Sequence, residues 1–497
     1  WNSYKRHCSL TIPVMRSNYP EGVEHTSPGH RPTAIKLSVW DWYYTHLLYY
    51  ELFINDHPKR KRDNGCKKSI QITQNLLEAP NFQTNHKRQV TDFTRNRKLN
   101  FVSVMLVLFQ KSAKSLQLVL NELSQRFLFH STVSNSAFSQ ARLKLKHTAF
   151  IELNQKAIVE VRYEEKTYRT WKGHRLLAID GMQVPLPDSE SIRQAFGTQS
   201  VSNQYETCQG DYPLAIASVL YDVLNHIGLD AQLAHSKSYE VNLAVEHLKY
   251  TQANDLLIFD RNYLSFYFLA VLTSQRRDFL IRAQQASFLV IQEMFTGDIE
   301  DQIVTLKVPR DQKSKMRSLH LPTEIQLRLL RVVLDNGEVE VLVTSLLDQK
   351  QYPLDEFKAL YARRWGVETF YSTLKGRLTL ENFTGTSAEA VRQDFFATIY
   401  ISGLESILTE NADEILKQKS LKNRFPQQVN KAVAFNAIKN RVFEIFAEKE
   451  DLDTTLEELT QLFLTNPVLI RKERSPERKK SIRRSYHYQK RVRKFIF

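Results

Sequence analysis

Hydrophobic and polar positions divide the chain into stretches of helical pattern and stretches of strand pattern. Apolar residues recur at helical spacing over 101–128, and again over 131–158, where serine and threonine residues can cap a helix start. From residue 174 the pattern changes to short apolar runs bounded by turn residues. These runs predict buried strands at 174–181, 212–224, 228–234, 254–263 and 278–283, with helices at 240–250 and before the last strand. This order indicates an α/β fold with a mixed sheet.

A second block of strand pattern does not continue that order. It covers 304–309, 324–334 and 338–347, and the pair Asn336–Gly337 predicts a hairpin turn before its last strand. Helical pattern returns at 354–378 and 388–408. We therefore expect a β-rich segment to be inserted between two parts of an α/β core.

The helical stretches at 101–128 and 131–158 leave two interpretations open. Two short helices joined by a serine-rich turn resemble a helix-turn-helix arrangement, in which one helix lies in a DNA groove. A plain helical bundle explains the same pattern equally well.

The overall charge favours a polyanionic partner. The 497 residues carry a net charge of +15 and 42% are hydrophobic, so real cores are expected together with basic surfaces. Nucleic acid is the first candidate and an anionic membrane surface the second. No apolar run reaches the roughly 20 residues that span a bilayer. Three widely separated cysteines, Cys8, Cys66 and Cys208, argue against a disulfide framework or structural zinc and favour a reducing intracellular compartment.

The last stretch, 471–497, holds twelve lysines or arginines against two glutamates. A solvated tail explains this composition. Three aromatic residues, Tyr486, Tyr488 and Phe495, lie among the charges. An arm that binds a nucleic-acid backbone is therefore the alternative.

Two aspartates close neighbouring strand patterns. Asp180 follows one apolar run and Asp260 another, and ligand chemistry in α/β sheets gathers at the carboxyl ends of strands. With a glutamate from a packed helix they would form a cluster of three carboxylates, which repel one another unless a cation neutralises them. Hard oxygen ligands suit Mg²⁺ or Mn²⁺, and a pair of such ions promotes phosphodiester cleavage. Four other aspartates compete for this role: Asp188, Asp222, Asp230 and Asp255.

The helical stretch YARRWGVETFYSTLK at 361–375 carries an unusual polar stripe. On a single helix Tyr361, Arg364, Glu368 and Lys375 lie along one narrow face. Either this face is exposed to water, or it faces something that needs both signs of charge.

This stretch matches the Y-x2-R-x3-E-x6-K signature, and the chain here resembles the DDE transposases of the family-four bacterial insertion sequences. The segments 92–101, 176–181, 256–263 and 381–397 are similar to the same family in the same order, so the resemblance covers about residues 70 to 420. One departure is Asn262, where the family often has glycine, and asparagine tolerates a positive φ better than most residues.

The resemblance implies roles for particular residues. Asp180, Asp260 and Glu368 match the catalytic triad of the family. This triad binds two divalent metal ions, which are Mg²⁺ or Mn²⁺. Tyr361, Arg364 and Lys375 match the positions that hold transposon-end DNA. The implied fold is an RNase H-like mixed sheet with flanking helices, interrupted by a β-rich insertion. The implied partners are double-stranded DNA, both inverted repeats and target, and a second copy of the chain in a synaptic homodimer. No membrane partner is implied, and the expected location is the bacterial cytoplasm, at the nucleoid.

We accordingly divide the chain into six regions. These are an N-terminal extension (1–68), a helical DNA-binding region (69–170), the first part of the RNase H-like catalytic core (171–284), the β-rich insertion (285–348), the second part of the core (349–420) and a helical C-terminal region with a basic tail (421–497).

The expected function is metal-dependent DNA cleavage and strand transfer at the ends of an insertion sequence. Two alternatives stay open. One is a catalytically decayed copy that binds DNA and inhibits transposition, and the other is an RNase H-like nuclease without strand transfer.

Overall fold

The computed structural model describes residues 63–95, 97–111, 115–126, 132–164, 168–203, 206–334, 336–447 and 452–471. The arm predicted beyond residue 471 and nearly all of the N-terminal extension lie outside these residues.

The first helices of the described chain are α2 (Asp63–Glu78), α3 (Pro80–His86), α4 (Phe101–Phe109), α5 (Leu116–Arg126), α6 (Asn135–Arg142), α7 (Thr148–Leu153) and α8 (Val161–Glu164). The strands of the central region are β1 (Arg175–Pro185), β2 (Thr198–Asn203), β3 (Glu206–Asp222), β4 (Ile227–His235), β5 (Asp255–Phe259) and β6 (Asp278–Arg282). The helices between them are α9 (Glu190–Phe196), α10 (Glu240–His247) and α11 (Phe266–Ser274).

The chain then adds α12 (Leu289–Thr296), β7 (Asp301–Lys307), α13 (Lys313–Ser318), β8 (Glu324–Val333) and β9 (Val339–Thr344). The remaining elements are α14 (Leu354–Ala362), α15 (Trp365–Gly376), α16 (Ala388–Ser420), β10 (Gln427–Val429), α17 (Lys431–Asn440), α18 (Val442–Phe446), α19 (Leu452–Thr465) and β11 (Pro467–Leu469). The predicted strands are all present within a few residues of their expected ends.

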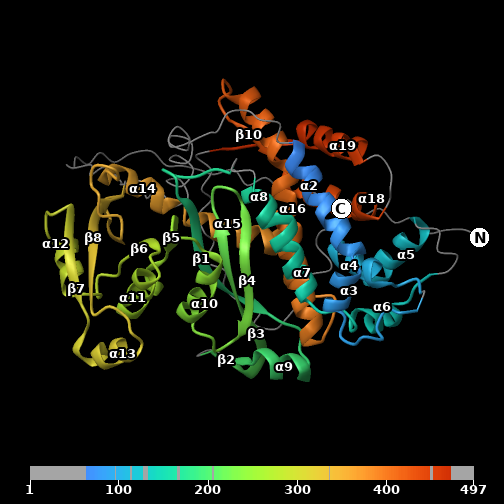
Figure 1. The fold of residues 1–497 in the computed structure, drawn as a ribbon, viewed down its shortest axis with the longest axis horizontal. Helices are drawn as coiled ribbons and strands as arrows, with labels where there is room; N and C mark the ends of the chain where they lie inside the picture. Colours follow the sequence, from blue (N-terminus) through green and yellow to red (C-terminus); the bar gives the residue numbers. More distant parts are fainter. Residues whose placement is uncertain are drawn as a thin grey trace, which may run out of the picture. The chain divides into compact units, whose positions relative to one another are not determined.

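Within the described residues, β1 to β9 form one mixed sheet (Figure 1). Its order is β2-β3-β1-β5-β6-β9-β8-β7, and β4 pairs with β3. The chain runs antiparallel from β1 to β3 and from β3 to β4, whereas β1, β5 and β6 are parallel to one another. The predicted α/β class with a mixed sheet is therefore confirmed.

The β-rich segment extends this same sheet. Strand β9 pairs antiparallel with β6, and β8 and β7 follow outward, so no separate sheet forms from these three strands. The predicted hairpin joins β8 to β9: Gly337 has a φ of +81°, and the side chain of Asn336 accepts a hydrogen bond from Glu338 N at 3.0 Å. Glycine fits this position because a positive φ is strained for other residues.

The helical stretches at 101–128 and 131–158 are shorter in the structure than predicted. The first divides into α4 and α5, and the second into α6, α7 and a π-helical stretch, Asn154–Glu160. These helices pack against the C-terminal region, as Figure 1 shows for α4 beside α18. Phe109 of α4 stacks on Tyr400 of α16, with ring centroids 4.9 Å apart, and lies 6.1 Å from Phe446 of α18.

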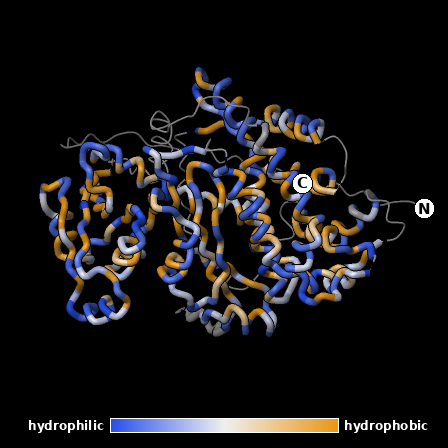
Figure 2. The backbone as a smooth tube through the Cα atoms, in the orientation of Figure 1, coloured by the Kyte–Doolittle hydropathy of each residue, from blue (hydrophilic) through white to orange (hydrophobic). Residues whose placement is uncertain are grey.

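The hydrophobic core continues from the sheet into these helices. Helix α16 is 33 residues long and is buried along much of its length, and the hydropathy-coloured backbone shows apolar positions concentrated where elements meet (Figure 2). None of the described helices is both long enough and apolar enough to cross a membrane.

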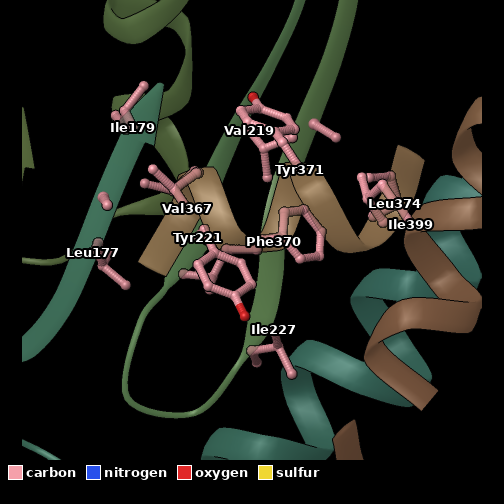
Figure 3. Close-up of a cluster of buried hydrophobic side chains, with 14 of the residues drawn as sticks. Leu177, Ile179, Val219, Tyr221, Ile227, Val367, Phe370, Tyr371, Leu374 and Ile399 are labelled. Carbon is pink, nitrogen blue, oxygen red and sulfur yellow. The ribbon is translucent and has the colours of Figure 1, made fainter. Parts of the chain in front are cut away.

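The two faces of the sheet carry different helices. Tyr221 of β3 stacks on Phe370 of α15, with centroids 4.4 Å apart, and Ser218 of the same strand bonds to His247 of α10. Because side chains alternate along a strand, these two contacts lie on opposite faces. Figure 3 shows Val367, Phe370, Tyr371 and Leu374 of α15 gathered near Val219 and Tyr221.

Candidate active site

Asp180 lies in β1, and Asp260 directly follows the neighbouring parallel strand β5. The last paired residues of β1 and β5 are Ala178 and Ile258, and each aspartate follows two positions later, so the two stay in register. Asp180 shares a face with its β3 partner Val219, which is the face covered by α15. The register is what brings the two carboxylates together.

The prediction that Asp180 closes its strand is wrong. Strand β1 continues to Pro185, because the residues after Asp180 keep pairing with β3. Strand β5 ends at Phe259, before the predicted end at residue 263, so Asp260 follows directly after it. Asp180 is therefore held inside a continuous strand, at the level where the parallel partner stops.

Local hydrogen bonds fix both aspartates. Asp180 Oδ1 accepts from Gly181 N at 2.9 Å. Asp260 accepts from the backbone N–H of Asn262 at 2.8 Å and from its side-chain amide at 3.2 Å. Asn262 is not among the described residues with a positive φ, so its role here is to orient Asp260.

The stretch 354–378 is not one helix, as the pattern predicted, but two. Helix α14 ends at Ala362 and α15 begins at Trp365. Between them Arg363 and Arg364 keep helical dihedral angles, but their N–H groups bond three residues back, to Leu360 and Tyr361, at 3.1 and 3.0 Å. This tighter turn places Tyr361 on one helix and Glu368 on the next.

Arg364 connects the carboxylates. Its Nη2 donates to Glu368 Oε1 at 2.7 Å, and its Nη1 lies 3.9 Å from Asp180 Oδ2. Arg364 is only 6% exposed, and its guanidinium carbon lies 4.5 Å from the ring centroid of Trp365. A buried guanidinium therefore provides the positive charge between two of the three predicted catalytic acids.

The pKa of Asp180 reflects its burial and the charged groups around it. Burial raises the pKa of Asp180 to about 7, and the charges of Asp260 and Glu368 add to the rise. The guanidinium of Arg364 and the N–H of Gly181 act against it. Asp260 and Glu368 thus raise the pKa of Asp180, and Arg364 compensates them only in part.

The competing aspartates each have a partner of their own. Asp188 pairs with Arg193 and Asp255 with Arg175, both at 2.6 Å, and Asp230 bonds to His247 at 2.7 Å. Asp222 accepts hydrogen bonds from Tyr163, Asn225 and the backbone of Leu224. These four carboxylates have structural roles in the fold, which a sequence pattern alone does not reveal.

Tyr361 and Lys375 lie on either side of Glu368 along the chain. Tyr361 is 5% exposed, and its pKa is raised by burial. Lys375 has a side chain that is 36% exposed, and its Nζ lies 3.0 Å from Glu381 and donates to Gln183 O at 3.3 Å. Of the three residues predicted to bind DNA, only Lys375 is substantially open to solvent.

Sequence reasoning missed three residues around the acids. The hydroxyl of Tyr371 donates to the backbone carbonyl of Asp180 at 2.7 Å. The hydroxyl of Tyr263 is buried without a hydrogen-bond partner, and the pKa of Tyr263 is raised by burial and by the charges of Asp180 and Glu240. Glu240 is half-buried, and its pKa is raised by burial and by Asp260. The motif order gives no signal for these contacts, because they join separate elements.

The donor chemistry suits a hydrated divalent cation. Carboxylate oxygens are the ligands that Mg²⁺ and Mn²⁺ prefer, and the unpartnered hydroxyl of Tyr263 offers a partner for bound water. Among the described residues, no three His, Cys, Asp or Glu side chains are already spaced as metal ligands. Arg364 holds Glu368 in this arrangement, so Glu368 would have to leave the guanidinium to join an ion.

Comparison with known proteins shows similarity to transposases. Residues 171–402 match the family described as "Transposase DDE domain". The chain is 28% identical, over 275 residues, to the transposase InsG for insertion sequence element IS4 of Escherichia coli K12, a match that covers 54% of this chain and 59% of InsG. The chain thus aligns with less than two thirds of that relative. A structure of the piggyBac transposase synaptic complex with hairpin DNA aligns with 84% of this chain and 85% of its own, at 9% identity and a TM-score of 0.37. Residues 171–402 are thus similar to a transposase DDE domain, and part of the chain is similar to an IS4 transposase.

Proposed function

We propose that this chain binds the terminal inverted repeats of an insertion sequence and catalyses DNA cleavage and strand transfer. The observation that carries the proposal is the placement of the three acids. Asp180 and Asp260 are in register on parallel strands, and Arg364 links Asp180 to Glu368 on α15. Because the substrate is chromosomal DNA, the proposed place of action is the nucleoid.

We propose an RNase H-like core for this domain. Its support is the strand order β4-β3-β1-β5-β6, with three antiparallel strands followed by two that run parallel to β1. The six regions defined from the sequence are part of the same proposal. Strands β7 to β9 would be the insertion between the second aspartate and the glutamate.

We propose that Asp180, Asp260 and Glu368 hold two divalent ions, Mg²⁺ or Mn²⁺. Bound there, the ions would activate water and stabilise the leaving oxygen of a phosphodiester. The protein's own part is to fix these acids: Gly181 and Tyr371 hold Asp180, and Asn262 holds Asp260. Rigid support of this kind matters because small misplacements of a reacting group cost rate.

The reaction is a hydrolysis followed by a transesterification. A water oxygen bonds to phosphorus at the transposon end, the P–O bond to the 3′ oxygen breaks, and that oxygen takes up a proton to become a 3′-hydroxyl. The 3′ oxygen then bonds to a phosphorus of target DNA, loses its proton, and displaces a target 3′ oxygen. No covalent protein–DNA intermediate is needed.

We propose that Tyr361, Arg364 and Lys375 hold the DNA end, with Lys375 making the first contact because it is the most exposed. Phosphate contacts by lysine and arginine are electrostatic and therefore depend on salt. The helical region of residues 69–170 would bind the inverted repeat, and two copies of the chain would pair in the synaptic complex.

Cleavage of a labelled inverted repeat tests the proposal. With Mg²⁺ or Mn²⁺ we expect specific nicking by the wild type, and a loss of at least about 100-fold in Glu368→Gln with end binding retained. Glu246→Gln is a matched control, because Glu246 is exposed on α10, outside the proposed DNA-binding region, and lies 3.9 Å from Lys249.

The outcomes separate the alternatives. Normal cutting by Glu368→Gln would show that the third carboxylate is assigned wrongly. Binding by the wild type without any cutting would favour a decayed, inhibitory copy. Cutting without strand transfer would favour a nuclease.

A further inference from the structure

A fourth acidic residue, Glu240, lies near Asp260 and beside the residue that follows Asp180. It is the first residue of α10, and it reaches strand β1 at the residue that follows Asp180. A Cβ added to Gly181 would lie 2.8 Å from Glu240 Oε1 and 2.9 Å from its carboxyl carbon. Only a residue without a side chain lets the Glu240 carboxylate lie this close to the strand.

The end of β5 connects the two faces of the sheet at this level. Asp180 is on the α15 face, and Gly181, which pairs with Ser218, is on the α10 face. Because β5 stops at Phe259, the edge of β1 beyond Ala178 has no strand beside it on that side. Acids from both faces can therefore meet around this edge.

The buried hydroxyl of Tyr263 indicates what kind of group lies between these acids. Tyr263 is 1% exposed, its hydroxyl has no hydrogen-bond partner, and the carboxylates of Asp180 and Glu240 are its strongest charged neighbours. An unsatisfied buried hydroxyl costs free energy, so a partner such as water is expected there. Among the described residues, no ion pair to Glu240 is found, whereas Asp188 and Asp255 each pair with an arginine and Asp230 bonds to His247.

We propose that Glu240 and the Tyr263 hydroxyl together hold a water molecule of the divalent ion bound by Asp180 and Asp260. This inference rests on the proposed function, and it adds a positioning pair to it. Mg²⁺ keeps several of its waters when bound to protein, so groups that hold those waters contribute to affinity. Such supporting groups typically change metal affinity or activity by about 10- to 100-fold.

Calorimetric titration of Mn²⁺ into the full chain without DNA tests the pair directly. We expect Glu240→Gln and Tyr263→Phe each to weaken Mn²⁺ binding by about tenfold or more. Both variants should also need a higher Mg²⁺ concentration for half-maximal nicking. Their nicking rates at saturating Mg²⁺ should change less. Glu246→Gln is the control, because Glu246 is on the same helix but is exposed and lies 3.9 Å from Lys249.

Gly181→Ala provides a second route to the same site. The added methyl group must displace the Glu240 carboxylate, so Mn²⁺ binding should weaken in this variant and fall no further in combination with Glu240→Gln. Circular dichroism verifies that each variant is folded.

Three results decide the matter. Wild-type Mn²⁺ affinity in both Glu240→Gln and Tyr263→Phe would overturn this inference and leave the proposed function intact, provided that Asp180→Asn abolishes binding. Additive losses in the double variant would also overturn it. A wild type that neither binds metal nor nicks DNA would refute the proposed function itself.

Discussion

Arg364 and Glu368 form a short ion pair, with Nη2 of the arginine 2.7 Å from Oε1 of the glutamate. They are four residues apart across the start of α15, and the same guanidinium reaches toward Asp180. A residue predicted to hold DNA therefore also neutralises a predicted catalytic acid. This relationship suggests that the positive charge of Arg364 keeps the acids together before metal arrives.

Removing the charge of Arg364 should lower the free energy of unfolding, and a bound divalent ion should restore it. We expect Arg364→Gln to reduce the free energy of unfolding by about 1 to 3 kcal/mol, because Asp180 loses its nearby cation. Mn²⁺ should then stabilise this variant more than it stabilises the wild type. Urea unfolding with and without Mn²⁺ measures both effects, and equal stabilisation of the two proteins would contradict the idea.

Tyr371 offers a test of how Asp180 is positioned. Tyr371→Phe removes the hydrogen bond to the backbone carbonyl of Asp180 and keeps the buried ring. We expect a loss of about 10-fold in nicking rate, with binding of the DNA end unchanged. Single-turnover cleavage and a mobility-shift assay measure the two quantities. Tyr250→Phe is a suitable control, because Tyr250 follows α10 away from the acids and lies beside Lys249.

Arg142 connects the helical region to α16. It is 2% exposed and donates to Gln393, Thr384, Ala390 O and Asp394, and Asp394 is completely buried. Arg142→Met should destabilise the protein by about 3 to 5 kcal/mol, because it leaves a buried carboxylate unpaired.

The exposed pair formed by Arg193 and Asp188 provides the comparison. Arg193→Met should cost much less than Arg142→Met, because solvent screens an exposed ion pair. Chemical denaturation measures both variants, and similar losses would show that burial of the Arg142 pair is not what matters.

Lys111 predicts a dependence of stability on pH. Burial lowers the pKa of Lys111 from 10.5 to about 8, although Asp394 acts in the opposite direction. Between these two values the unfolded chain binds more protons than the folded chain, so this contribution makes stability rise with pH.

The gain should be about 2 kcal/mol between pH 7 and 9.5, and it should be absent in Lys111→Met. Urea unfolding of both proteins across this range measures the difference, to which Lys439 also contributes because the charge of Lys111 lowers its pKa. A constant difference between the two proteins would show that the Lys111 ammonium group is not destabilised by burial.

The sequence by itself determined the elements of this protein and the residue types of its site. Short apolar runs locate β1, β3, β4, β5 and β6, because a buried strand needs little besides side chains that leave water. The Asn336–Gly337 turn was equally local. The four signature residues marked the helix pair, although not its division, because a turn that bonds three residues back has the same apolar pattern as a helix.

Only the tertiary structure decided which acids gather at the site and which pair elsewhere in the fold. Asp222, Asp230 and Asp255 look like Asp180 along the chain, yet each finds its own donor from a distant element. The register of β1 against β5 sets Asp180 beside Asp260, and the end of β5 lets Glu240 and Tyr263 approach them. These relationships depend on pairing between strands and on charge compensation across the fold, and neither leaves a mark in the local spacing of residues.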